Sequence, residues 1–133
     1  MKFKNMFSPI QIGPMTVKNR FVVPPMGNNF ANSDGTWSDE SVAYYGERAK
    51  GQFGLITIEA TVVHKGAKGG PKKPCLYDDN SIESLKKITD ACHAEGAKVS
   101  IQLQNAGPEG NAKNAGAPIQ AATAIASADG RGF

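Results

Sequence analysis

The sequence predicts an α/β fold in which parallel strands alternate with helices, and two observations lead to this expectation. Short runs rich in Val, Ile and Phe occur at 20–23, 54–60 and 97–103, and runs of that length suit buried strands. Segments 41–50 and 80–95 lie between them and have helical spacing of apolar residues. Strand–helix–strand units build a parallel sheet. The order matches a partial (β/α)8 TIM barrel, whose complete form needs about 250 residues.

The composition is that of a globular domain. The chain has 133 residues, of which 40% are hydrophobic and 20% charged, and its net charge is +3. Basic residues are scattered apart from one loop group: Lys65, Lys68, Lys72 and Lys73. That group could attract phosphate, although a solvated loop is the favoured interpretation. The density and aromatic interleaving of a nucleic-acid surface are lacking, so no nucleic-acid partner is expected.

Cysteine usage and hydropathy indicate a cytoplasmic protein. The spacing of Cys75 and Cys92 fits no metal-ligand pattern, and unpaired thiols suit a reducing compartment. No signal-peptide core follows Met1, and no apolar run approaches the length of a membrane span. We therefore expect no metal site in this chain and no membrane partner.

The first elements are a β-hairpin and a short buried strand. Apolar and polar residues alternate on either side of the turn at Gly13-Pro14, which places the hairpin within 7–19. The stretch 20–27, RFVVPPMG, follows as a strand expected to be buried on both faces. Its two prolines should end sheet pairing, because proline cannot donate to a ladder. The residues after them would then lie at the carboxyl end of the sheet, where α/β proteins bind ligands. A core strand with a stiff end is the simpler interpretation of this stretch alone.

Both helices begin with capping signals. Thr36 with Asp39, and Asn80 with Glu83, have capping-box spacing, and Ser38 is a further candidate N-cap. The second helix also carries an expected apolar stripe made of Ile82, Leu85, Ile88, Ala91 and Cys92.

The second and third strands each carry one notable polar residue. Glu59 ends the run at 54–60, and a carboxylate near a sheet interior needs a partner. Pairing with Arg20 or a lysine is slightly favoured over a catalytic role. Gln102 lies near the carboxyl end of 97–103, on its less apolar face.

Two segments are expected to be loops. The long loop 61–78 is rich in Gly and Pro, and loops of that length tend to be functional or flexible. Segment 104–133 is dominated by Asn, Ala, Gly and Pro, and we expect it to be loop-rich or flexible.

Several short motifs form a specific pattern through their order and spacing. They are Met6-Phe7-Ser8-Pro9-Ile10, Val17-Lys18-Asn19-Arg20, Val23-Pro24-Pro25-Met26, YGERAKG at 45–51, GLITIEA at 54–60 and Ile101-Gln102-Leu103. Together they resemble the amino-terminal part of the Old Yellow Enzyme family, the NADH:flavin oxidoreductases. The most similar group is the bacterial one that includes 2,4-dienoyl-CoA reductases and clostridial enoate reductases.

The resemblance implies that residues 1–133 are the amino-terminal part of a flavin-binding barrel: the hairpin, the first three strands and two helices. In this family FMN lies at the carboxyl end of the barrel. NADH or NADPH reduces it, and the flavin passes hydride to the activated C=C bond of an enoate or enone. The expected substrate is therefore a small unsaturated carbonyl or acyl compound. Some relatives also hold an iron–sulfur cluster, whose ligands would lie in a downstream region.

The resemblance also carries cofactor contacts over by position. Pro25, Met26 and Gly27 would line the flavin, and Ala60 would pack near the ring. Gln102 would hydrogen-bond the pyrimidine edge, which suits a side chain with both a donor and an acceptor. Relatives often have Thr, Cys or Ala where this chain has Gly27, so redox tuning by a side chain at that position is lost.

The sequence departs from the family after the third strand. Asn105-Ala106-Gly107-Pro108 replaces a His-Ala-Gly-Arg type sequence. The family's substrate-polarising His/His or His/Asn pair and its tyrosine proton donor come from later strands, and His64 and His93 do not substitute for them. Catalytic residues are therefore unassigned. The alternative hypothesis is a truncated, non-catalytic fragment that self-associates, or pairs with a separate remainder of the barrel, through exposed strand edges.

Overall fold

The computed structural model describes residues 3–123. In this range the α-helices are α1 (Lys4–Phe7), α2 (Asp39–Lys50), α3 (Ile82–Ala94) and α4 (Ala112–Ala115). The strands are β1 (Ile10–Ile12), β2 (Met15–Val17), β3 (Val22–Val23), β4 (Leu55–Val62) and β5 (Lys98–Gln104). Short 3₁₀ turns lie at Lys65–Ala67, Asp79–Ser81 and Gly107–Glu109.

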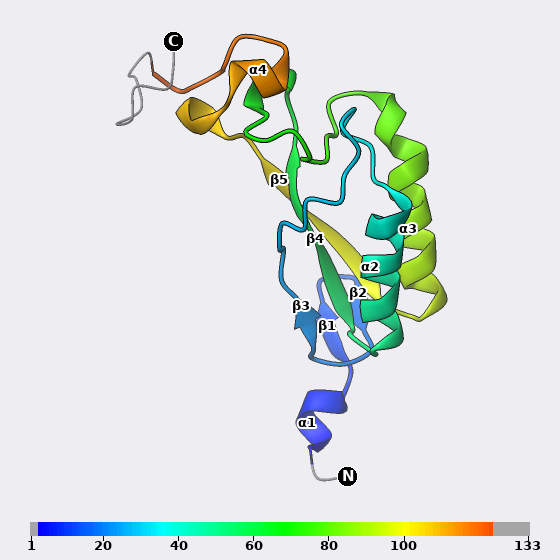
Figure 1. The fold of residues 1–133 in the computed structure, drawn as a ribbon. Helices are drawn as coiled ribbons and strands as arrows, with labels where there is room; N and C mark the ends of the chain where they lie inside the picture. Colours follow the sequence, from blue (N-terminus) through cyan, green and yellow to red (C-terminus); the bar gives the residue numbers. More distant parts are fainter. Residues whose placement is uncertain (1–2, 124–133) are drawn as a thin grey trace.

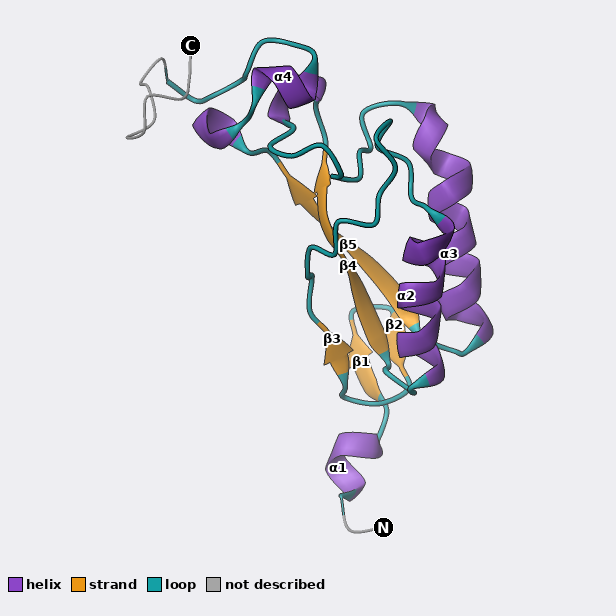
Figure 2. Cartoon of the chain, viewed as in Figure 1, coloured by secondary structure: helices purple, strands orange, loops and turns teal. Residues whose placement is uncertain are grey.

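Strands β3, β4 and β5 form a parallel sheet in that order, and α2 and α3 connect them in turn. Both helices lie on the same face of the sheet (Figures 1 and 2), as right-handed crossovers of neighbouring strands require. The predicted α/β fold class is therefore confirmed. Strands β1 and β2 form the predicted hairpin as a separate antiparallel pair, with Ile10 opposite Val17.

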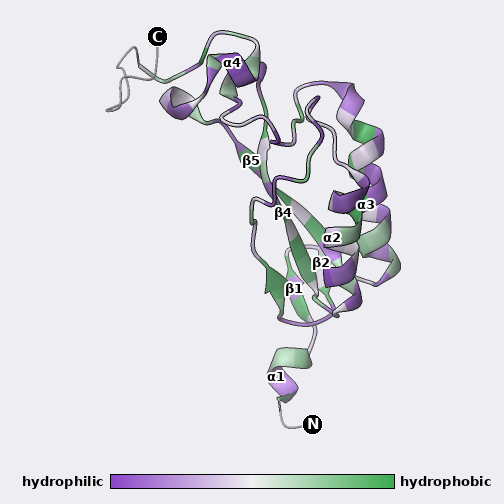
Figure 3. Cartoon of the chain, in the orientation of Figure 1, coloured by the Kyte–Doolittle hydropathy of each residue, from purple (hydrophilic) through white to green (hydrophobic). Residues whose placement is uncertain are grey.

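The core lies between the sheet and the two helices. It contains Val23, Trp37, Tyr45, Ala49, Ile56, Ile58, Ile88, Cys92 and Ala97. Apolar residues are frequent in β3 and β4, and α2 and α3 carry both polar and apolar residues (Figure 3). The opposite face of the sheet is open, so Val22 is 48% exposed. Burial of the first strand on both faces, expected from its composition, is therefore wrong.

The helix caps differ from the predicted capping boxes. Ser38 caps α2 by accepting a hydrogen bond from the Ser41 amide at 3.2 Å. The Thr36 hydroxyl instead donates to Asp34 at 2.7 Å, and hydrogen bonds from Thr36 lower the pKa of Asp34. The turn Asp79–Ser81 precedes α3, and Ser81, the N-cap residue of that helix, makes no side-chain capping hydrogen bond. In addition, Ile82 is 59% exposed, so it does not belong to the buried stripe.

A tight junction joins the hairpin to the sheet. The Asn19 side chain donates to the carbonyl of Gln52 at 2.7 Å and accepts from the Phe21 amide at 3.1 Å. Gly54 lies against it, because a Cβ there would be 2.7 Å from both Asn19 Oδ1 and Val17 Cγ1. This junction fixes the start of β4, and with it the register of the whole sheet.

The segment after β5 consists of two short helical turns and loops. Asn111 caps α4, and Gly116 ends that helix with a positive φ of 60°. Backbone hydrogen bonds from Asn111 to Lys68 and from Gln120 to Gly66 tie this segment to the loop after β4. Residues 124–133, the rest of the segment expected to be loop-rich or flexible, lie outside the described residues.

Candidate functional site

The residues after β3 continue along the second half of β4. Pairing of β3 with β4 ends at Val23, opposite Ile56, immediately before the prolines, as expected from their missing amide donors. Pro25 is half-buried, whereas Met26 and Gly27 are exposed. Gly27 lies at the level of Glu59, because a Cβ at Gly27 would be 3.7 Å from Glu59 Oε2. The first strand therefore brings its last residues beside the end of the second.

A β-bulge brings Ala60 and Gln102 to the same level. Ile58 pairs with Ile101 and Thr61 pairs with Leu103, so two residues of β4 oppose the single residue Gln102 of β5. The Gln102 carboxamide is exposed and has no hydrogen-bond partner among the described residues. Its donor and its acceptor are both available to a ligand. With Gly27 beside Glu59, three neighbouring strands present candidate contacts at one edge of the sheet.

Glu59 is fully buried at this edge, and its partner is not Arg20. Arg20 is exposed, and among residues 3–123 Glu59 has no ion pair within 4.0 Å. Its Oε2 accepts a hydrogen bond from the Asn28 amide at 3.3 Å, while Oε1 is buried without a partner. Burial raises the pKa of the Glu59 carboxyl, against opposing effects of the Asn28 amide and the Lys73 charge. The predicted pairing with Arg20 is therefore wrong, and Lys73 interacts with Glu59 only at longer range.

Lys73 reaches this edge from the loop that follows β4. Its Nζ lies 3.1 Å from the position that a Cβ on Gly27 would take. The side-chain amide nitrogen of Asn28, the residue after Gly27, is buried without a partner in the described part of the chain. The loop lysines were expected to be solvated, and Lys68 also departs from that expectation. It is only 4% exposed, and its Nζ donates to the carbonyl of Ser33 at 3.0 Å.

Tyr45 supports β4 from the helix side. Its hydroxyl accepts a hydrogen bond from the Glu59 amide at 3.0 Å. Burial raises the pKa of this phenol to about 12, so it stays protonated at neutral pH. The spacing of Val42, Tyr45 and Ala49 predicts that Tyr45 faces the core. No sequence signal predicts that its hydroxyl accepts the hydrogen bond of the Glu59 amide at the bulge.

The contacts of His64 and the burial of the two cysteines indicate structural roles. His64 Nδ1 accepts a hydrogen bond from the Gly66 amide at 3.0 Å, which caps a 3₁₀ turn. Cys75 and Cys92 are buried, and burial raises the pKa of both thiols, that of Cys92 to about 11. Within the described range, no three His, Cys, Asp or Glu residues are grouped so that they could hold a metal ion.

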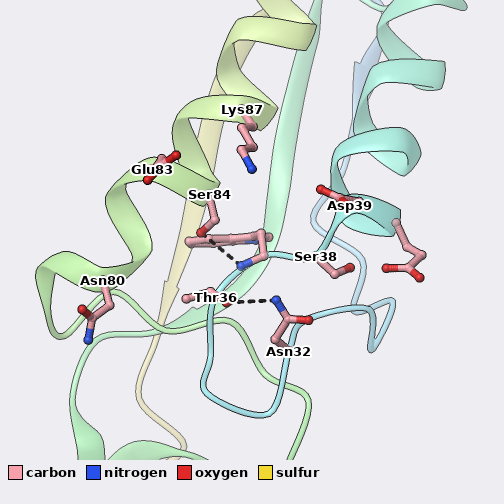
Figure 4. A pocket seen from close by; sticks show the side chains of 10 residues that line it. Asn32, Thr36, Ser38, Asp39, Asn80, Glu83, Ser84 and Lys87 are labelled. Atoms are coloured by element: carbon pink, nitrogen blue, oxygen red, sulfur yellow. Dashed lines mark hydrogen bonds between the residues drawn. The ribbon is translucent and has the colours of Figure 1, made fainter.

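A polar hollow of about 460 Å³ lies between the first turns of α2 and α3 (Figure 4). Asp39, Glu83 and Lys87 line it, and Ser84 accepts a hydrogen bond there from the Trp37 amide at 3.2 Å. None of the sequence-predicted contacts of the sheet edge lines this hollow. Its carboxylates come from the helices and not from the strand ends, so we place the candidate site at the sheet edge instead.

Comparisons with known proteins agree on one family. Residues 5–129 match the model of the NADH:flavin oxidoreductase / NADH oxidase family. The chain is similar to Old Yellow Enzyme from Pichia sp. AKU4542, with 34% identity, a TM-score of 0.83, and coverage of 91% of this chain and 32% of that one. It is also similar to 2-naphthoyl-CoA reductase in complex with 2-naphthoyl-CoA (34% identity, TM-score 0.81, covering 86% and 17%). A third similar structure is morphinone reductase in complex with tetrahydroNAD (29% identity, TM-score 0.73, covering 80% and 28%).

These similarities identify the sheet and helices as part of a (β/α)8 barrel, which confirms the predicted partial barrel. The chain spans about a third or less of the length of these relatives. No helix within residues 3–123 has the length and hydropathy needed to cross a membrane.

Proposed function

The chain belongs to the NADH:flavin oxidoreductase / NADH oxidase family, and we propose that it forms part of the FMN site of an enzyme that reduces activated C=C bonds. The observation that carries this proposal is the common level of Gly27, Ala60 and Gln102 on three neighbouring strands. Ligands of parallel α/β proteins bind at this carboxyl end.

The residues at the sheet edge fit a flat, polar-edged ring. Gly27 and Ala60 have little or no side chain, so they leave room for a ring to approach the strands. The free carboxamide of Gln102 offers one donor and one acceptor, which matches a flavin pyrimidine edge that presents both. Pro25 stiffens the backbone before Met26, whose exposed side chain can cover an apolar part of the ring.

The chemistry in this proposal belongs to the cofactor, and this chain contributes placement. Bound FMN would accept hydride from NADH or NADPH and deliver it to the C=C bond of an enoate or enone. Two similar structures support this assignment through their ligands, because one contains tetrahydroNAD and another contains a CoA ester. Among the described residues we assign no proton donor, since Tyr45 is buried and His64 caps a turn.

FMN titration tests the proposal directly. We expect the chain to quench FMN fluorescence on binding and Gln102→Leu to weaken that binding about tenfold, because a buried ring edge would lose its hydrogen bonds. Gln11→Leu is the matched control, since Gln11 is exposed on the hairpin at the other end of the molecule (Figure 1). Equal affinities for both variants would refute the role of Gln102, and no binding by the wild-type chain would refute the FMN site.

The second candidate function is non-catalytic assembly through strand edges. β3 and β5 are the outer strands of a three-stranded sheet, and they carry the exposed apolar side chains of Val22 and Leu103; such edges can pair with another chain. Sedimentation velocity would then show a dimer or larger species whose population rises with concentration. A monomer across the concentration range would exclude assembly of this chain with itself.

A further inference from the structure

We propose that the Lys73 ammonium takes the place of the side chain that position 27 lacks and raises the reduction potential of the bound flavin. This inference deepens the proposed function and rests on it. It also reverses one expectation from the sequence, namely that Gly27 leaves the flavin without tuning at this position.

The first argument is geometric. Lys73 Nζ lies 3.1 Å from the point where a Cβ of residue 27 would be, so a larger residue at this position would displace it. Gly27 directly follows Pro25 and Met26 at the strand end, beside Glu59 of the next strand. A lysine from a distant loop therefore presents its charge at the proposed ring-binding edge.

The second argument is that two buried polar atoms, one on Asn28 and one on Glu59, lack hydrogen-bond partners. Asn28 Nδ2 and Glu59 Oε1 are both buried without hydrogen-bond partners among residues 3–123. Buried polar atoms usually have a partner, so an unsatisfied donor and acceptor on two residues beside the exposed Gly27 indicate a site for a polar ligand. The 3.3 Å hydrogen bond from the Asn28 amide holds the Glu59 carboxyl at this edge.

The third argument concerns charge. Lys73 makes no ion pair within 4.0 Å in the described part of the chain, so its charge is not neutralised by direct contact with Glu59. Reduction adds two electrons to a flavin, and a nearby positive charge stabilises the more negative state. Lys73 should therefore favour the reduced flavin, while an ionised Glu59 should oppose it.

Equilibrium redox titration of the FMN-loaded protein, followed by visible absorbance, separates these effects. Lys73→Gln should lower the reduction equilibrium constant about tenfold, which is ~30 mV for a two-electron couple. Lys73→Arg should retain the wild-type value within about threefold, because it retains the charge. Glu59→Gln should shift the potential in the opposite, more positive direction. Lys72→Gln is the matched control, since it removes the same charge from the exposed neighbouring residue.

A second measurement does not depend on the folding of any variant. In the wild-type protein, FMN should slow acetylation of the Lys73 amine severalfold and leave Lys72 unaffected. An unchanged reduction potential in Lys73→Gln, or an equal effect of FMN on the acetylation of Lys72 and Lys73, would overturn this inference while leaving FMN binding intact. No binding of FMN by the wild-type chain would overturn the inference together with the proposed function.

Discussion

Replacing Tyr45 with phenylalanine removes the one group that satisfies the Glu59 amide at the bulge of β4. The tyrosine hydroxyl accepts that amide hydrogen at 3.0 Å, and both residues are buried. A phenylalanine ring would fill the same space, so packing between α2 and β4 should be unchanged. The substitution therefore isolates a single buried hydrogen bond.

The magnitude follows from what is left behind. Removing one partner strands a buried backbone donor, which costs about 1–3 kcal/mol of unfolding free energy. Water cannot easily replace the hydroxyl, because Glu59 is fully buried and Tyr45 is 1% exposed. We expect Tyr45→Phe to fall in the middle of that range, at about 2 kcal/mol.

Urea denaturation followed by circular dichroism measures this loss. The midpoint should fall while the m-value stays constant, because the surface exposed on unfolding is the same. Tyr44→Phe is the matched control, since the described residues offer its hydroxyl no hydrogen-bond partner and its ring still packs under Arg48. That control should stay within about 0.5 kcal/mol of the wild type. Similar losses for both variants would refute the hydrogen-bond argument.

Three further predictions concern the same fold. Gly54→Ala should destabilise the fold by about 1–3 kcal/mol, because the new Cβ would lie 2.7 Å from Asn19 Oδ1. Gly46→Ala should stabilise it by about 0.5–1 kcal/mol, because the new Cβ would make only an ordinary contact at 3.7 Å. Urea midpoints that move in the same direction for both variants would contradict these expectations. Burial raises the pKa of Glu59 above its ordinary value of 4.5, so its contribution to stability is present below that value and lost as pH rises through the folded-state pKa. The stability of Glu59→Gln relative to wild type should therefore increase from about pH 4 to about pH 8, and a constant difference would show that Glu59 titrates normally. The buried Cys92 thiol, with its pKa raised to about 11, should resist a disulfide-exchange reagent in the native protein and react in urea; rapid native labelling would contradict its burial.

Local sequence signals account for most of the fold. The helices begin and end close to their predicted bounds, because apolar spacing and a following glycine act within a few residues. The spacing of a capping box, in contrast, does not decide which side chain caps a helix. Ser38 caps α2, and Thr36 is held by Asp34, because several polar residues compete for the same amides.

The candidate site is less predictable, because its contacts join distant segments. Alternation along the third strand places Gln102 near a strand end, and its free carboxamide agrees with that position. The surroundings of Glu59 do not follow from the sequence, because Lys73 arrives from a Gly- and Pro-rich loop with no periodic pattern. Lys68 is buried for the same reason, since its acceptor, the carbonyl of Ser33, lies in another loop.

The bulge between Ile58 and Thr61 also limits how this chain can be recombined with other barrel fragments. Joining this chain within that stretch to a parent without the bulge would leave β4 one residue too long or too short, which would shift its pairing with β5 by one residue and turn every later side chain of β4 to the other face. Thr61 and Val62, both fully buried, would then exchange faces. Chimeric barrels should therefore join partners before Ile58 or after Val62, so that the irregular pair is inherited from a single parent.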